Sequence, residues 1–178
     1  MDQHFHVQEQ ITAFCGQMKD RTLPRWEEIP DLELYMDQVL NLTRRYLQSY
    51  PESEENRVTS SMVNNYVKAG LLPPPVRKRY NAEHVARLFM ICILKNSLPI
   101  AMIKKIFDDR SKSNEGMPDF YNGFCDTFEK TFEESVTTHL SGADDSVTDI
   151  ILCAALRAHA EQSLALKLCA DGLNDSDG

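Results

Sequence analysis

Residues 57–80 read RVTSSMVNNYVKAGLLPPPVRKRY, and this stretch decides how the rest of the chain is organised. Thr59 and Ser60 are residue types that cap the N-terminus of a helix. Gly70 tolerates the left-handed conformation that closes a helix, after which Leu71 and Leu72 can pack back against it. The sequence therefore predicts a short helix that ends at Gly70, followed by a proline-stiffened loop that carries Arg77, Lys78 and Arg79.

Basic side chains concentrate around this helix and loop. Residues 57–105 contain nine Lys and Arg and one acid, Glu83, in a chain with 19 basic and 27 acidic residues and a net charge of −8. The other residues therefore hold 10 basic and 26 acidic side chains. Such asymmetry indicates a patch that faces a polyanion, and a solvated charged face is the ordinary alternative.

Apolar periodicity predicts helices on both sides of this unit. Asp31 is placed to cap a helix that runs to about Ser49. Its predicted buried face comprises Leu32, Tyr35, Met36, Val39, Leu42 and Tyr46. The helix predicted over 81–96 is apolar almost all round, so it must be buried from several sides. Pro99 starts a further helix. Its inward residues would be Ile100, Ile103, Ile106 and Phe107.

The two ends of the chain add further elements. Residues 2–20 have the pattern of an amphipathic helix, and 22–30 read as an extended strap pinned by Trp26 and Ile29. The polar stretch 108–117 is a predicted linker. A last, Ala-rich helix should begin at Asp145 or Ser146 and end near Ala170. This helix could pair with a partner copy. The acidic tail, 173–178, should be disordered.

An aromatic stripe follows Pro118. It comprises Phe120, Phe124, Phe128 and Phe132, continued by Val136 and Leu140. Residues four apart share one face of a helix. Core packing is the ordinary interpretation of such a stripe, and a protein interface or a hydrophobic ligand pocket stays open beside it.

The order of these motifs resembles the DNA-binding domain of the MerR family of bacterial regulators. The resemblance lies in residues 62–66 (MVNNY), 70–73 (GLLP), 79–80 (RY) and 98–103 (LPIAMI). The runs that begin at Trp26, Met62 and Ile93 are similar to an uncharacterised bacterial family, a domain of unknown function with a MerR-like core. Asn64 and Asn65 stand where the MerR motif has Arg and Tyr.

The resemblance implies an all-α fold: a MerR-like winged helix-turn-helix core with additional N- and C-terminal helices and at most a short β-wing near 76–80. The expected division is an N-terminal helix and strap (1–30), the winged helix-turn-helix (31–109), a C-terminal helical pair for packing or dimerisation (118–172) and the tail (173–178).

The function that follows is sequence-specific binding of double-stranded DNA by a transcription regulator. Asn side chains can read adenine, while Ser, Lys and Arg serve phosphates. The predicted DNA-binding residues are Ser60, Ser61, Asn64, Asn65, Lys68, Arg77, Lys78 and Arg79. The alternative is a protein–protein interaction module on a winged-helix scaffold, without DNA binding.

Other classes find little support in the sequence. No run is long and apolar enough to cross a bilayer and no leader is present, so we expect a cytoplasmic protein without a membrane partner. The five cysteines form no Cys-x-x-Cys motif and read as buried thiols. Neither His4 with His6 nor Cys92 with His84 makes a convincing metal or nucleophile pair. We therefore expect no enzyme activity, cofactor or metal, with a homodimer through the C-terminal helices as one assembly.

Overall fold

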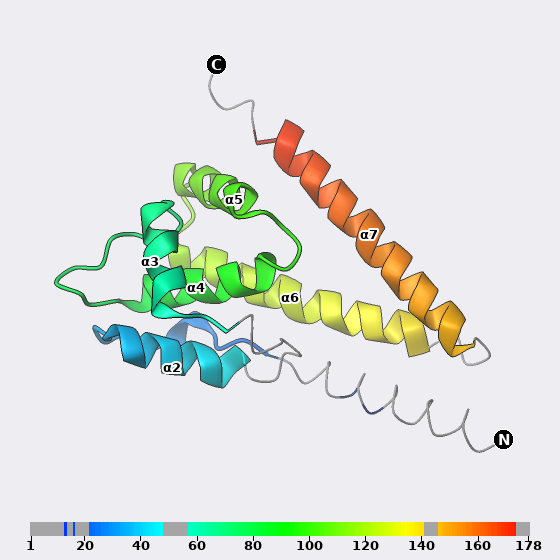
Figure 1. The fold of residues 1–178 in the computed structure, drawn as a ribbon, viewed down its shortest axis with the longest axis horizontal. Coiled ribbons are helices and arrows are strands. Elements are labelled where there is room, and N and C mark those ends of the chain that lie inside the picture. The colour runs from blue at the N-terminus through cyan, green and yellow to red at the C-terminus, as the bar shows by residue number, and fades with distance from the viewer. Residues whose placement is uncertain (1–12, 14–15, 17–21, 48–56, 141–145, 174–178) are drawn as a thin grey trace.

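The computed structural model describes residues 13, 16, 22–47, 57–140 and 146–173. Its elements are a 3-10 turn and six α-helices (Figure 1). In chain order they are η1 (Trp26–Glu28), α2 (Met36–Leu47), α3 (Ser60–Lys68), α4 (Ala82–Leu94), α5 (Ile100–Lys112), α6 (Met117–Leu140) and α7 (Val147–Asp171). Within the described residues the only β-structure is two isolated bridges, so the expected all-α class is confirmed. The predicted N-terminal helix falls outside the described residues, apart from the helical Ala13 and Gly16, and so does the tail from 174 on.

Helix α4 is the centre of the fold. Asn81 caps it, as predicted, by accepting a hydrogen bond from the His84 N–H. Its buried residues are His84, Val85, Ala86, Leu88, Phe89, Met90, Ile91 and Cys92. Helices α2, α5 and α6 all contact it. The expectation that this apolar helix is covered from several sides is therefore confirmed.

The N-terminal strap and α6 are fastened to each other and complete the core. The Arg25 guanidinium donates hydrogen bonds to Asp126 and Glu129, each at 2.7 Å. The Trp26 N–H donates to Asn122 Oδ1 at 2.9 Å. Leu23 and Ile29 of the strap, and Tyr121, Cys125 and Phe128 of α6, are all buried in the same core. The core thus continues beyond 31–109 in both directions.

The aromatic stripe on α6 packs against this core. Phe128 is buried, and Phe120, Phe124 and Phe132 are half-buried against it. The most deeply buried row of α6 is Tyr121 and Cys125, one residue further along the chain from the first two stripe positions. Val136 and Leu140 have side chains outside the described set.

Residues 31–35 do not form the predicted start of a helix. Leu34 and Tyr80 exchange two backbone hydrogen bonds, at 2.8 and 2.9 Å, in an antiparallel bridge. This pairing keeps the segment extended, and α2 begins only at Met36. Leu32 is consequently 70% exposed and Tyr35 is also exposed, so both were wrongly placed in the buried face.

Three smaller expectations also need correction. The strap is not wholly extended, because Trp26–Glu28 forms one 3-10 turn. Helix α5 continues to Lys112, which shortens the predicted linker to residues 113–116. Cys92, Cys125 and Cys169 are buried as expected, but Cys153 is exposed, and Cys15 lies outside the described residues. Burial raises the pKa of the Cys125 thiol to about 11, so this group is inert at neutral pH.

Helix α7 begins where predicted. The Ser146 side chain caps it by accepting a hydrogen bond from the Asp149 N–H at 3.2 Å. Its C-terminal half packs on α5, with Cys169 buried there. Gln162 donates to the Ser97 carbonyl at 2.9 Å. Figure 1 shows α7 running along the side of the body formed by the other helices.

Candidate nucleic-acid interface

Helix α3 begins at its predicted cap. The Thr59 hydroxyl accepts a hydrogen bond from the Met62 N–H at 3.3 Å. This bond satisfies one of the backbone donors that the first turn of a helix leaves unpaired. The N-terminus of α3 is therefore fixed by a side chain within the helix's own sequence.

The C-terminus of α3 is closed by Gly70, as predicted. Gly70 has a φ of +73°, and its N–H donates to the Val67 carbonyl at 3.1 Å. The Leu71 N–H donates to the Tyr66 carbonyl at 2.9 Å. Together these bonds make a Schellman closure, which turns the chain back so that Leu71 and Leu72 are buried.

The two faces of α3 differ in polarity. Val63 and Tyr66 are buried, while Met62 and Val67 flank them half-buried. The exposed polar residues are Ser60, Ser61, Asn64, Asn65 and Lys68. With 3.6 residues per turn, these five lie within an arc of roughly 140°. These are the five residues of α3 that were predicted to face outward.

Residues 76–79, the basic turn, lie within the connection from α3 to α4. The Arg79 N–H donates to the Val76 carbonyl at 2.9 Å, which closes a two-residue turn. Its central residues, Arg77 and Lys78, have φ angles of +51° and +63°. Left-handed φ at both positions is typical of type I′ turns, which usually use Asn and Gly there. Figure 1 shows the connection that contains this turn projecting from the body between α3 and α4.

The three cations of the basic turn have different surroundings. The Arg79 guanidinium lies 3.6 Å from the centre of the Tyr35 ring and donates to the Glu33 carbonyl at 3.3 Å. Arg77 and Lys78 are exposed, and no hydrogen bond or ion pair holds their side chains within the described part of the chain. Arg79 is therefore committed to holding the turn against residues 33–35, while the other two are available to a ligand.

His84 holds the other end of the loop. Its ring is buried, with Nε2 3.1 Å from the Pro73 carbonyl oxygen and Nδ1 3.1 Å from the Asn81 backbone nitrogen. Nδ1 also lies 2.5 Å from the Asn81 Oδ1 atom, so the ring is held at both of its nitrogens. Burial lowers the pKa of His84 below its ordinary value. The sequence analysis missed this contact, although a His three residues after a capping Asn is a signal for it.

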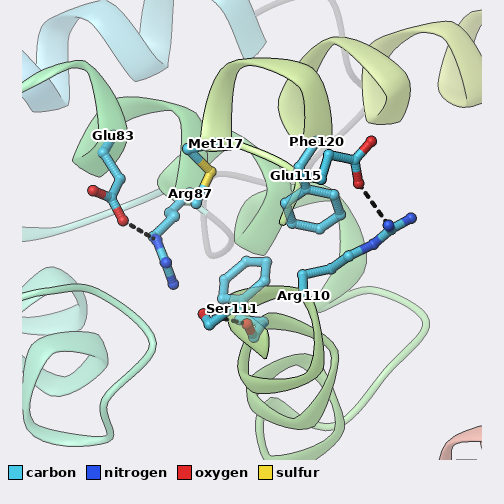
Figure 2. A pocket seen from close by; sticks show the side chains of 8 residues that line it. Glu83, Arg87, Arg110, Ser111, Glu115, Met117 and Phe120 are labelled. Atoms are coloured by element: carbon cyan, nitrogen blue, oxygen red, sulfur yellow. Dashed lines mark hydrogen bonds and ion pairs between the residues drawn. The ribbon is translucent and has the colours of Figure 1, made fainter. Parts of the chain in front are cut away.

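A small pocket lies behind α3. Figure 2 shows it between α4, α5 and the start of α6, and its volume is about 200 Å³. Arg87 donates to Glu83 at 2.9 Å and to the Leu71 carbonyl at 3.4 Å. Arg110 donates to Glu115 at 2.6 Å. Each arginine thus already has a carboxylate, and the volume is below the roughly 300 Å³ at which small-molecule sites begin. The hydrogen bond from Arg87 to the Leu71 carbonyl ties the turn after α3 to α4, so these side chains have a structural role.

The basic patch is smaller than the sequence indicates. Of the nine basic residues in 57–105, four are exposed and five are half-buried. The exposed ones are Arg57, Lys68, Arg77 and Lys78. Lys104 illustrates the others, because its Nζ lies 2.5 Å from the Asp108 carboxylate. Three of these four exposed cations, Lys68, Arg77 and Lys78, lie on α3 and the basic turn.

Metal sites and membrane spans are not found in the described ranges. No group of three or more His, Cys, Asp or Glu there could hold a metal ion. No helix of the described residues has the length and apolar character that crossing a membrane requires.

Comparison with known families gives one match. A family model described as a domain of unknown function (DUF1836) matches residues 24–124. The match runs from the strap into α6 and includes α3, the basic turn and α4. No curated protein and no solved structure matches the chain.

Proposed function

The chain belongs to the DUF1836 family, and from that premise we propose that it is a DNA-binding transcription regulator. In this proposal α3 enters the major groove and the basic turn contacts the phosphate backbone. The observation that carries it is the succession of an exposed polar helix face and a projecting turn whose Arg77 and Lys78 lack partners among the described residues.

The residue types on α3 divide the work of recognition. Asn64 and Asn65 can each make two hydrogen bonds to an adenine edge, which supplies sequence information. Ser60, Ser61 and Lys68 are suited to phosphate oxygens, which fix the register of the helix without reading bases. Arg77 and Lys78 add charge-assisted phosphate contacts that make binding depend on salt.

The order of elements supports a MerR-like winged helix-turn-helix core, as in the bacterial regulators that this sequence resembles. A short helix is closed by Gly70, and a proline loop, a two-residue basic hairpin and the buried α4 follow. Leu34 pairs with Tyr80, so that the hairpin is anchored to the segment that precedes α2. This anchoring suits a wing that must keep a fixed position beside its recognition helix.

The test compares two kinds of variant by fluorescence anisotropy. A preferred site is first selected from random duplexes, and binding to it and to a scrambled duplex is then measured at several salt concentrations. Asn64→Ala should lose about 1–3 kcal/mol on the preferred site and keep nearly all of its non-specific affinity. Asn114→Ala, which removes the same side chain from the exposed 113–116 linker, is the matched control and should bind normally.

Two outcomes would count against the proposal in different ways. An equal loss on both duplexes for Asn64→Ala would remove Asn64 from base readout. If the unmodified protein binds no duplex even at low salt, DNA binding is excluded, and the rival function, a protein–protein interaction module on the same scaffold, takes its place. Helix α7, with its exposed leucines, would then be the surface to examine.

A further inference from the structure

The outward face of α3 is poor in charge and carries two amides. Its five exposed polar residues are two serines, two asparagines and a single lysine, Lys68, in the last turn. The sequence of α3 contains no arginine, glutamine, aspartate or glutamate. Serine hydroxyls suit any base, and recognition helices contact bases with their N-terminal residues, which leaves Lys68 for the phosphates. The side chains on α3 that can tell one base from another are therefore Asn64 and Asn65.

These two asparagines are held in fixed directions. They lie between Val63 and Tyr66, which are both buried in the core. Hydrogen bonds close α3 at both of its ends. Both asparagines are exposed, and neither side chain makes a hydrogen bond to another residue in the described part of the chain. Two amides without a protein partner thus project from adjacent positions of an anchored helix.

An amide side chain is matched to one base in the major groove. Adenine presents N7 as an acceptor and its 6-amino group as a donor, and an asparagine amide offers the complementary donor and acceptor. Guanine presents two acceptors, O6 and N7, which require the paired donors of a cationic side chain. Asn64 and Asn65 therefore select adenines, and each one needs the amino hydrogen that points into the groove.

Methylation of the adenine N6 atom removes that hydrogen. In a duplex the 6-amino group uses one hydrogen to pair with thymine, so a methyl group on this nitrogen takes the place of the other hydrogen, in the major groove. The asparagine oxygen then meets a methyl group where it needs a donor, and its hydrogen bond is lost. Given the DNA binding proposed above, we propose that N6-methylation of adenine within the bound site blocks this protein, so that α3 distinguishes unmethylated from methylated duplex.

The cations should not respond to this change. Lys68, Arg77 and Lys78 are assigned to phosphates, and methylation of a base leaves the phosphates as they are. The number of phosphate contacts sets the slope of log affinity against log salt. Methylation should therefore lower the affinity at every salt concentration by the same factor and leave the slope unchanged.

The experiment uses the full chain and its preferred duplex, in which single adenines are replaced in turn by N6-methyladenine. At one or two neighbouring adenines, methylation should lower the affinity measured by anisotropy about 5- to 150-fold, which is the loss of one bidentate contact. 7-Deaza-adenine at the same positions removes only the N7 acceptor and should also weaken binding there, because it breaks the other hydrogen bond of the same amide.

Two variants connect each amide with its adenine. Asn64→Ala should bind the methylated and unmethylated duplexes within about twofold at the adenine that Asn64 reads, because the contact that methylation breaks is already gone. It should stay sensitive at the adenine that Asn65 reads, and Asn65→Ala should show the reverse. Asn114→Ala, in the exposed linker, is the matched control and should keep both sensitivities. The altered side chains are exposed, so all variants should melt as the unmodified protein does, which circular dichroism checks.

The outcomes separate this inference from the proposed function. A preferred duplex that is bound equally tightly whichever adenine is methylated overturns the inference and leaves DNA binding standing. An equal loss on methylation in the unmodified protein and in both variants also overturns it, because the effect would then come from the shape of the DNA. If the unmodified protein binds no duplex even at low salt, the proposed function fails and this inference fails with it.

Discussion

The basic turn offers a direct test of the idea that its sequence serves binding at the expense of stability. Arg77 and Lys78 adopt φ angles of +51° and +63°. A left-handed conformation costs a residue with a β-carbon about 1–2 kcal/mol. Changing Lys78→Gly removes that cost but gives back about 0.5–1 kcal/mol through the greater freedom of glycine in the unfolded chain. Arg77→Asn installs a residue that tolerates this region.

We therefore expect the double variant Arg77→Asn, Lys78→Gly to gain about 1 kcal/mol in the free energy of unfolding. For a chain of this size that corresponds to an increase in melting temperature of about 2–4 °C. The matched control is Arg77→Ala, Lys78→Ala, which removes the same two charges and keeps β-carbons at both positions. It should be no more stable than the unmodified protein.

Both double variants should lose duplex affinity to the same extent. Each lost phosphate contact lowers the slope of log affinity against log salt by about 0.9, so two lost contacts lower it by about 1.8. Urea unfolding measures the stability difference, and anisotropy in a salt series measures the slope. If the Asn-Gly variant is no more stable than the Ala-Ala variant, the argument from backbone strain is refuted. If neither variant changes the slope, Arg77 and Lys78 do not contact phosphate.

Two further predictions concern the core and the buried His84. Ile91→Asp places an unpaired charge in the centre of α4 and should unfold the protein, whereas Leu32→Asp, at a position 70% exposed, should change stability by less than about 0.5 kcal/mol. A soluble Ile91→Asp protein that melts cooperatively in urea or heat would contradict the core assignment. Burial lowers the pKa of His84 in the folded protein below its ordinary value. As pH falls, the unfolded chain therefore binds a proton at His84 before the folded protein does. The stabilisation that His84 contributes above about pH 6.5 should be lost as pH falls through the folded-state pKa. The difference in unfolding free energy between the unmodified protein and His84→Gln should therefore shrink between pH 8 and pH 5, and a constant difference would show that folding does not lower the pKa of His84.

Local signals explain what the sequence predicted well. The limits of α3 follow from Thr59 and Gly70, and those residues make their hydrogen bonds within the same helix. The start of α4 at Asn81 and the start of α7 at Ser146 are of the same kind. The outward face of α3 follows from helical periodicity alone. Each of these features depends on residues a few positions apart, which a sequence displays directly.

Features set by distant partners were missed. Residues 31–35 have an apolar spacing that fits a helix, but Leu34 pairs with Tyr80, 46 residues away, and becomes extended. The basic charge of 57–105 looked like one patch, because the sequence cannot show that Arg79 stacks on Tyr35. The buried row of α6 could not be distinguished from the phenylalanine stripe, since Phe120 and Tyr121 are both aromatic and only the fold shows that Tyr121 lies against Trp26 of the strap. In each case tertiary packing overrode a pattern that was locally ambiguous.

The fastening of the strap to α6 has a consequence for how the protein folds as it is made. The Arg25–Asp126 ion pair joins residues 101 positions apart. At about 5–20 residues per second, a ribosome needs roughly 5–20 s to synthesise that interval. Helix α4 ends 34 residues before Phe128, so for roughly 2–7 s of this time it has been made but lacks the cover of Tyr121, Cys125 and Phe128. The order of synthesis thus leaves the most apolar helix of the chain without part of its cover until α6 emerges.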